Sequence, residues 1–416
     1  LGWIDQTSLS AVSLAGQVQF VLSLFISGIA AGAGIMAAQY WGKQDAASIE
    51  KVIPIALRTN LLFSGLFTIL AGFCPEMLMR IFTNDAALVA SGSQYLRAVA
   101  LSYVLCGISQ VYLILLKNTG HAAVSSRISS TAVVLNIILN AILIYGLCGA
   151  PALGIRGAAY ATVAARVVEL IWAYLETKKP ERVRILWNRL FSSAGKILSE
   201  DFWRYTLPVL AASLVWGIAY VLYSVIMGHM GSDAVAANSI TSIAKSLLSC
   251  LIRGVSGGAG VLIGNLLGAN ELEKAREYGG RLSHLSIAIG IVTGGLLMLI
   301  SPAIVHFAPL SDTAAEYLQY MLLFCGLNLM AQSVNTTVLD GIFCAGGDAK
   351  FDMQGNIGAM WCFSVPLGFL AAFWLKLPVM VVYCIVNLDE IVKLPAVYHH
   401  YKKYIWVRNI TRDIED

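Results

Sequence analysis

The strongest constraint on the fold is a series of apolar segments, many of them twenty residues or longer, that recur along the whole chain. A segment of this length with few charges is typical of a helix that crosses a bilayer. Only 12% of the 416 residues are charged and 58% are hydrophobic. This composition excludes a soluble enzyme, a nucleic-acid binder and a disordered scaffold. We predict eleven spans, at 9–40, 52–74, 88–116, 128–149, 155–177, 204–228, 234–267, 279–306, 313–344, 353–375 and 377–398.

The loops between these segments alternate in charge, and this alternation predicts the orientation of the chain. One set of loops, together with the C-terminal tail, holds nineteen Lys and Arg residues. The alternate set holds three, Arg80, Arg156 and Lys376. Because loops rich in Lys and Arg stay in the cytoplasm, we expect a cytoplasmic C-terminus and residue 1 on the outer side.

An internal repeat explains the odd number of spans. GAGIMAAQYWGKQD at 32–45 matches GAGVLIGNLLGANE at 258–271, so that Gly42 falls on Gly268. The second half has six predicted spans and the first has five, which predicts that one helix is missing before residue 1. The expected fold class is therefore an all-α polytopic membrane protein with two pseudo-symmetric six-helix lobes. We predict an N-terminal lobe at 1–177, a cytoplasmic linker at 178–204, a C-terminal lobe at 205–398 and a cytoplasmic tail at 399–416.

Parallel repeats of this kind are typical of transporters with a site between two lobes. The sequence has no HExxH, no Ser/His/Asp constellation and no phosphate-binding glycine loop, so an enzyme is not expected. Its eight cysteines form no CxxC pair and no cluster with histidine that would suggest a metal site. We expect no cofactor other than a coupling ion.

The repeated motifs resemble the multidrug and toxic compound extrusion (MATE) family. The resemblance rests on QYWGKQD (39–45), its twin NLLGANE (265–271), LNIILN (135–140), GIRGAAYAT (154–162) and CAGGDAKF (344–351). It implies a bacterial plasma-membrane exporter, with this chain holding family helices 2–6 and 7–12. It also implies export of organic, often cationic and amphipathic compounds, driven by inward flow of Na⁺ or H⁺.

The resemblance also implies candidate ion-coupling residues. In some members, an Asn–x3–Asp pair and a Thr on the fifth and sixth helices bind the cation, and here those positions are Asn136, Asn140 and Thr162. This set predicts a possible Na⁺ site, because an Asn carbonyl oxygen can bind Na⁺ although it cannot carry a proton. Another branch has a Glu on the seventh helix, where this sequence has Trp216.

Charges inside the predicted spans give further candidates, because each needs a partner, a cavity or an interface. Arg166 and Glu169 are spaced to pair along one helix, either as a structural pair or in gating. Asp389, Glu390 and Lys393 are spaced in the same way, and could form a structural ion cluster or supply a proton-coupling carboxylate. Asp340, near a span end, is another coupling candidate.

Polar and aromatic stripes predict the faces that line a substrate cavity, since a polar face does not turn towards lipid. The aromatic stripe suits flat amphipathic cations, with ordinary helix packing as the alternative. Lys245 would repel a cationic substrate unless it is deprotonated or is paired, for example with Asp340. Alternatively, the substrate is neutral or anionic. The cavity candidates are Trp216, Tyr220, Tyr223, Asn238, Lys245, Asn328, Gln332 and Asn335.

The sequence thus predicts a monomeric secondary antiporter in a lipid bilayer that exports small organic molecules by alternating access and has no nucleic-acid partner. The alternative is a flippase for a lipid-linked saccharide of the same superfamily. A non-transporting membrane enzyme or sensor is disfavoured because no soluble domain is attached.

Overall fold

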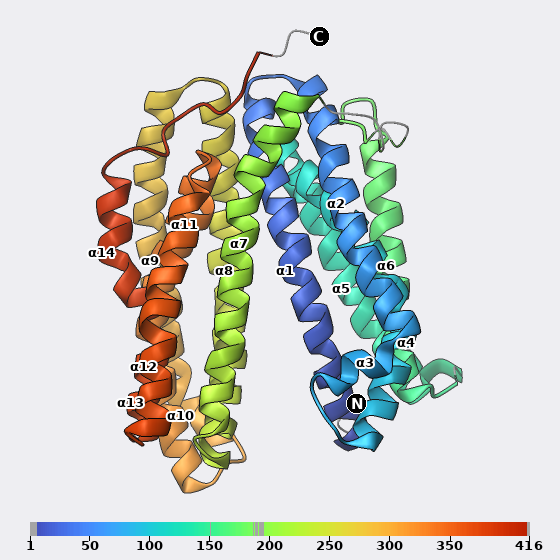
Figure 1. Cartoon of the computed structure of the whole chain (residues 1–416), viewed down its shortest axis with the longest axis vertical. Helices are drawn as coiled ribbons and strands as arrows, with labels where there is room; N and C mark the ends of the chain where they lie inside the picture. The colour runs from blue at the N-terminus through green and yellow to red at the C-terminus, as the bar shows by residue number, and fades with distance from the viewer. Residues whose placement is uncertain (1–5, 150, 186, 188–189, 191–194, 414–416) are drawn as a thin grey trace. The chain divides into compact units, whose positions relative to one another are not determined.

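The computed structural model describes residues 6–149, 151–185, 187, 190 and 195–413. Parts of the predicted lobe 1–177, linker 178–204 and tail 399–416 therefore lie outside the described residues. All regular secondary structure within the described ranges is helical (Figure 1), as the sequence predicts. The first half contains α1 (Gln6–Gly42), α2 (Ala46–Phe73), α3 (Pro75–Arg80), α4 (Ala86–Leu116), η1 (Lys117–His121), α5 (Ala122–Tyr145), η2 (Leu147–Gly149) and α6 (Gly154–Thr177).

The second half of the chain has the same character, with several short π-helical turns. Its elements are α7 (Lys196–Gly228), α8 (Ser232–Gly268), α9 (Leu272–Phe307), α10 (Asp312–Thr336), η4 (Thr337–Phe343), α11 (Ala349–Asn356), η5 (Ile357–Ser364), α12 (Val365–Phe369), η6 (Leu370–Trp374), α13 (Val379–Val386) and α14 (Asp389–Tyr401).

Nine helices within the described residues are long and apolar enough to cross a membrane. One of them, Ala86–Tyr145, contains two of the predicted spans, which meet at a kink where Thr119 and Gly120 leave helical geometry. The predicted span 377–398 is divided into α13 and α14, because the helix breaks at Asn387 and Leu388. Those nine helices and this broken pair together overlap all eleven predicted segments, although the ends differ; the predicted span 128–149, for example, ends at Tyr145.

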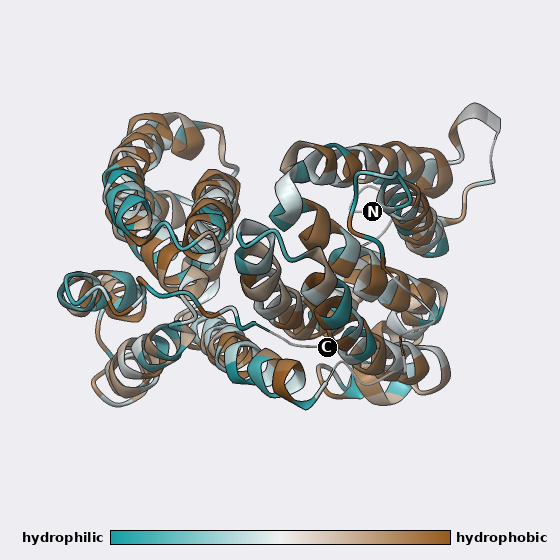
Figure 2. Cartoon of the chain, turned by 90° about the horizontal axis from the view of Figure 1, so that it is seen from above, coloured by the Kyte–Doolittle hydropathy of each residue, from teal (hydrophilic) through white to brown (hydrophobic). Residues whose placement is uncertain are grey.

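The chain forms two compact units, which differ in their limits from the predicted lobes. Unit 1 is Leu1–Ala37 with Asp45–Leu210, and unit 2 is Ala38–Gln44 with Ala211–Asp416. The last turns of α1 thus pack with unit 2. Seen end on, the helices of each unit are mostly apolar, and hydrophilic residues collect in the loops nearest the viewer (Figure 2).

The core of unit 1 forms where α1, α4 and α6 bring apolar residues together, with Leu22, Leu96, Val99 and Ala159 fully or almost fully buried. Many large apolar side chains elsewhere point outwards instead. Leu62 is 70% exposed and Leu299 in unit 2 is 78% exposed. An extensive apolar exterior of this kind suits contact with lipid rather than water.

In unit 2, α8, α9 and α10 pack against one another. Ile252, Leu297, Leu322 and Leu329 form its main core. A second core beside it surrounds Trp406, which is fully buried in the segment after α14. The tail is therefore an integral part of unit 2, as far as Asp413.

The repeated glycines of the sequence match meet in space within unit 2. A Cβ on Gly268 would overlap the carbonyl oxygen of Gln39, and a Cβ on Gly42 would overlap the carbonyl oxygen of Asn265. The two helix ends therefore cross with their backbones in contact, and each glycine makes room for the other helix. At this crossing, the two copies of the sequence repeat pack directly against each other.

Replacing Gly268 should test this crossing. Gly268→Ala places a methyl group against backbone that cannot move aside, and we expect it to lower the free energy of unfolding by about 1–3 kcal/mol. Gly258→Ala on the same helix is the matched control, since nothing lies within 4 Å of a Cβ there. Thermal unfolding of both purified variants in detergent measures the difference. Equal melting temperatures would contradict the close crossing.

Candidate ion and substrate sites

The structure brings together the three residues that the sequence predicts as a Na⁺ site. Asn136 and Asn140 lie on α5 and Thr162 lies on α6, and these two helices pack together in unit 1. Asn140 Nδ2 donates to Asn136 Oδ1 over 3.0 Å, and Asn136 Nδ2 donates to Thr162 Oγ1 over 3.4 Å. Asn140 Oδ1 is buried without a hydrogen-bond partner among the described residues. An unpartnered acceptor of this kind is compatible with a bound cation.

A cavity of about 200 Å³ adjoins this set, and it contains a carboxylate. Asn136, Thr162, Glu169, Arg166 and Gln19 supply its polar lining. Thr162, Arg166 and Glu169 occur at spacings of four and three residues, and so share one side of α6. Glu169 was predicted only as a pairing or gating residue, and its position beside Asn136 and Thr162 is what the sequence did not reveal. The spacing of Thr162, Arg166 and Glu169 along α6 was the one sequence feature that could have indicated this position.

Glu169 is held by two partners. Arg166 Nη1 donates to Glu169 Oε1 at 3.0 Å and to Oε2 at 2.9 Å. Ser109 on α4 donates its hydroxyl to Glu169 Oε1 at 2.5 Å. The Glu169 side chain is 2% exposed and that of Arg166 is 28% exposed. The predicted pair therefore exists, and its guanidinium is the accessible member.

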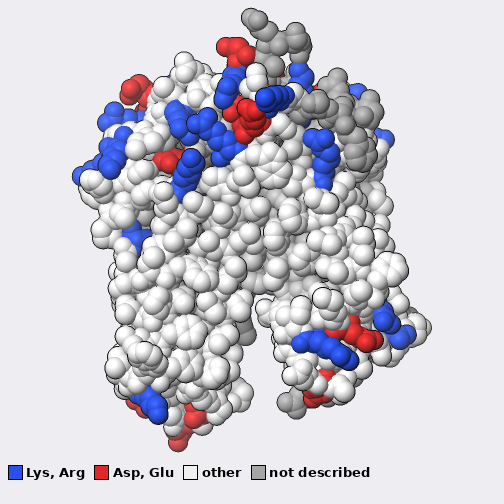
Figure 3. Space-filling model, viewed as in Figure 1, with Lys and Arg blue, Asp and Glu red and all other residues white. Residues whose placement is uncertain are grey.

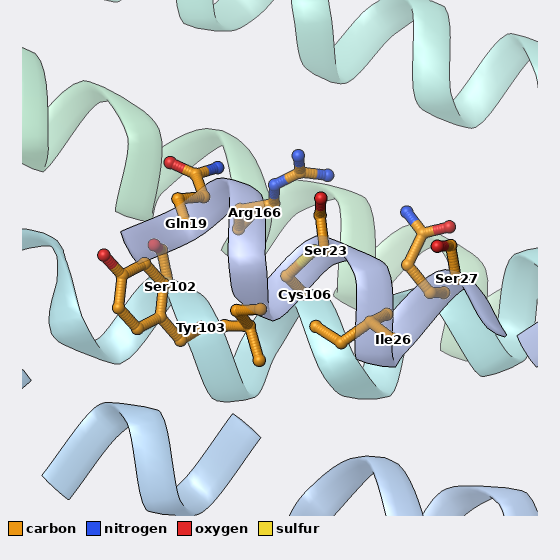
Figure 4. Close-up of a pocket in the computed structure, with 10 residues that line it drawn as sticks. Gln19, Ser23, Ile26, Ser27, Ser102, Tyr103, Cys106 and Arg166 are labelled. Atoms are coloured by element: carbon orange, nitrogen blue, oxygen red, sulfur yellow. The ribbon is translucent and has the colours of Figure 1, made fainter. Parts of the chain in front are cut away.

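A second pocket, of about 240 Å³, lies among α1, α4 and α6 of unit 1. Arg166 and Gln19 line both cavities. Figure 4 shows Gln19 and Ser23 of α1 together with Ser102 and Tyr103 of α4 around this pocket. The remaining lining residues are Leu22, Ile26, Ser27, Cys106 and Gln110.

In unit 2 the predicted ion cluster on α14 is formed and buried. Lys393 Nζ lies 3.2 Å from Glu390 Oε1 and 3.8 Å from Asp389 Oδ2. Asn335 Nδ2 donates to Glu390 Oε2 over 2.8 Å, and Lys393 also donates to Asn356 Oδ1 over 3.2 Å. Of the predicted coupling carboxylates, Asp389 and Glu390 are thus buried in an ion cluster.

Two other carboxylates lie near this network. Asp352, 6% exposed, accepts a hydrogen bond from Asn356. The hydrophobic pattern does not single out Asp352, because this residue stands one position before a predicted span. Asp340 is exposed, although it falls within the helical segment Asp312–Phe343. It therefore remains an accessible coupling candidate.

The polar stripe of α8 faces the stripe of α10. Lys245 Nζ donates to Asn328 Oδ1 over 3.0 Å, and Ser249 donates to Gln332 Oε1 over 3.4 Å. Asn328 in turn donates to the carbonyl oxygen of Asn387, at the break between α13 and α14. The partner of Lys245 is thus an amide, and no ion pair with Asp340 occurs among the described residues. Asn238 is half-buried.

The predicted aromatic stripe of α7 is divided between two environments. Trp216 and Tyr220 stack with ring centroids 5.6 Å apart, and Tyr220 is 39% exposed. The Arg253 guanidinium lies over the Trp216 ring at 5.6 Å. Tyr223 is buried among the apolar residues of the unit core. Trp216 and Tyr220 therefore remain accessible candidates, and a cation of the protein already lies over one of them.

Comparison with known proteins agrees with this architecture. A solved MOP superfamily transporter from Pyrococcus furiosus aligns with a TM-score of 0.87 and 19% identity, covering 97% of this chain and 89% of that chain. "Uncharacterized transporter YisQ" of Bacillus subtilis is 21% identical over 98% of this chain and 89% of its own length. "Probable multidrug resistance protein NorM" of Agrobacterium fabrum is 24% identical over 90% of this chain and 81% of its own length.

The fold and a matching family model define the class of protein, a multi-pass membrane transporter of small molecules rather than an enzyme. The MatE family model matches residues 1–142 and 208–370. The chain therefore belongs to the MatE family, as its repeated motifs predict.

The buried cluster on α14 gives a test of its structural role. Lys393→Met leaves Asp389 and Glu390 buried without their cation, and we expect it to lower the free energy of unfolding by about 3–5 kcal/mol. Lys350→Met, at an exposed lysine, is the control and should have little effect. Detergent unfolding curves measure both.

The double variant Lys393→Met/Glu390→Gln sharpens this test. Removing one buried negative charge should recover part of the lost stability if the cost arises from unpaired carboxylates. Equal stability of the Lys393 and Lys350 variants would contradict a structural role for the cluster.

Proposed function

We propose that this protein is a secondary active antiporter that exports amphipathic organic compounds, cations among them, in exchange for Na⁺ or H⁺. The observation that carries the proposal is the oxygen-lined cavity of unit 1, where Asn136, Thr162 and Glu169 meet. Membership of the MatE family and the name of the Agrobacterium fabrum relative, a probable multidrug resistance protein, support export of drug-like compounds.

The coupling ion is proposed to bind in this cavity. Amide, hydroxyl and carboxylate oxygens are the donors that a hard cation prefers. Asn136, Asn140 and Thr162 provide neutral oxygens, and Glu169 provides a carboxylate that is paired with Arg166. If the ion is H⁺, only Glu169 among these four can take it, because an amide is not protonated at accessible pH.

Alternating access requires only that the ion and the substrate stabilise different conformations. In unit 1 the two cavities share Arg166 and Gln19, so a ligand in one cavity contacts side chains that line the other. This arrangement supplies a direct physical link between ion binding and substrate binding. Asp340 in unit 2 is a second proposed coupling group, because its carboxylate is accessible.

The proposed location is a bacterial plasma membrane, with the protein working as a monomer and its C-terminus in the cytoplasm. In the view of Figure 3, the Lys and Arg side chains of unit 2 gather mostly at the end that carries the C-terminus. Since basic loops are retained on the cytoplasmic side, this distribution supports the orientation.

Removal of one amide should test the ion site. Asn140→Ala deletes an oxygen next to the cavity, and we expect it to abolish Na⁺-driven ethidium efflux from proteoliposomes. Asn84→Ala, at an exposed loop position, should leave efflux unchanged. Efflux that persists undiminished in Asn140→Ala would exclude this set of residues as the Na⁺ site.

The same vesicles separate the antiporter from a lipid flippase. An antiporter moves ethidium only when a Na⁺ or H⁺ gradient is present. Scrambling of a labelled lipid without ion dependence, and without ethidium efflux, would overturn the proposed function.

A further inference from the structure

The segment that follows α14 makes contacts that the proposed ion site does not use. Residues 402–406 form turns, and residues 407–413 have no regular secondary structure (red in Figure 1). The segment belongs to unit 2, which also contains the last turns of α1, Ala38–Gln44. We call residues 409–413 the latch segment, because they bond to this end of α1.

The part of the chain that directly precedes the latch segment is anchored firmly. Trp406 is fully buried in an apolar core with Ile263 of α8. Arg408 donates from Nε to the carbonyl oxygen of Gly346 and from Nη2 to that of Gly347, both over 2.9 Å. Burial of a large aromatic side chain stabilises more than an exposed hydrogen bond does, so this part stays on unit 2.

The latch segment itself is held to α1 by hydrogen bonds and an ion pair. The backbone N–H of Arg412 donates to Tyr40 Oη over 3.4 Å. Lys43 Nζ lies 2.7 Å from Asp413 Oδ1, and the Asp413 side chain is 96% exposed. Hydrogen bonds and exposed ion pairs are exchanged for contacts with water at a small net cost, so these contacts are reversible.

Gln39 lies at the centre of this contact, and its side chain is fully buried. Its Oε1 accepts a hydrogen bond from the backbone N–H of Ile410 over 2.8 Å, and its Nε2 donates to the carbonyl oxygen of Ala345 over 2.7 Å. One amide of α1 therefore bonds both to the latch segment and to the segment that follows η4. Gln39 begins the repeated motif QYWGKQD, and this contact gives it a role.

Two helices continue from one unit into the other. α7 is divided between Leu210 and Ala211, and α1 is divided between Ala37 and Ala38. Alternating access requires the two units to change their arrangement, which one shared helix permits more easily than two. The end of α1 is held by the reversible contacts and by the glycine crossing, where glycines lie directly against backbone. It is therefore the connection that can open.

We propose that the latch segment holds the end of α1 on unit 2 and releases it during the transport cycle. The proposal rests on the proposed function, because alternating access supplies the need for release. While the latch is open, the anchored residues around Trp406 keep the segment on unit 2, so that it can bind α1 again. The latch is thus a two-state element of the fold.

Cysteine labelling of the full chain in phosphatidylcholine nanodiscs tests whether the latch opens. Ile410→Cys and Val397→Cys each place a thiol at a buried aliphatic position of unit 2, and Val397 belongs to the core around Trp406. We expect a maleimide to label position 410 at least about tenfold faster than position 397, since release of the latch leaves the core intact. Peptide mass spectrometry separates both sites from the native cysteines. Equal rates would overturn the proposal.

Two changes in α1 test the assigned contacts in the Ile410→Cys protein. Gln39→Leu removes the acceptor of the Ile410 N–H, and should speed labelling at position 410 by about fivefold. Gln319→Leu, which removes a half-buried amide of α10, is the matched control and should leave the rate unchanged. Tyr40→Phe is a milder variant that removes one hydroxyl acceptor, and should speed labelling about twofold. Unchanged labelling in both α1 variants would contradict the latch.

A reversible cross-link tests whether transport needs the release. In Lys43→Cys/Asp413→Cys, a short bis-methanethiosulfonate cross-linker holds the latch closed. We expect ethidium efflux from proteoliposomes to fall at least about tenfold, because a required conformational step is blocked, and to recover with dithiothreitol. Glu277→Cys/Arg281→Cys is the matched control, since these residues also form an exposed ion pair in unit 2, and its cross-link should leave efflux unchanged.

Efflux and labelling together separate this inference from the proposed function. Full efflux while the latch is cross-linked would overturn this inference alone. Labelling does not depend on an ion gradient. Absence of gradient-driven efflux in the unmodified chain, with fast labelling at position 410, would overturn the proposed function and leave the opening of the latch standing.

Discussion

A charge within an apolar helix bundle has to be paired, because the surroundings offer little solvation, and this requirement organises the polar interior of both units. Arg166 and Glu169 satisfy it on one helix, and Lys393 satisfies it with two carboxylates of α14. The Arg166–Glu169 pair and the Lys393 cluster differ in how accessible their charged groups are. The cluster of unit 2 is closed on all sides, whereas in unit 1 one face of the guanidinium is left open to a pocket.

The second constraint is close packing between long helices. Small residues at crossings allow backbones to touch, which is how helices associate when lipid gives no hydrophobic driving force. Gly42 and Gly268 show this most directly, because the repeat places a glycine at the same point of two related helices and each accommodates the other backbone. The last turn of α1 is thereby fixed in unit 2, although the rest of α1 packs in unit 1. α1 thus contributes to both units, as does α7, which is divided between Leu210 and Ala211.

Most of the helical order could be predicted from the sequence, because apolar length alone identifies a spanning helix and glycine repeats identify related segments. The pairs Arg166–Glu169 and Glu390–Lys393 were also predictable, since helical spacing places their members on one side. Contacts between side chains of different helices were harder to predict. The hydrogen bond between Lys245 and Asn328 joins residues that are 83 positions apart, and their spacing along the chain gives no indication of relative depth. Likewise, the sequence could not show that Tyr223 is buried while Tyr220 is accessible. Their spacing of four and seven residues from Trp216 predicted only that the three side chains form one stripe.

The sequence by itself determined that the chain is a helical membrane protein built from a repeat, because hydrophobicity and periodicity are local properties that need no knowledge of neighbours. It also determined which charges require partners. Only the tertiary structure decided that Glu169 lies beside Asn136 and Thr162 in one cavity, and that Arg166 and Tyr103 line another. The reason is that a cavity arises from the rotation and depth of several packed helices, and these depend on side-chain contacts between segments that are distant in the sequence.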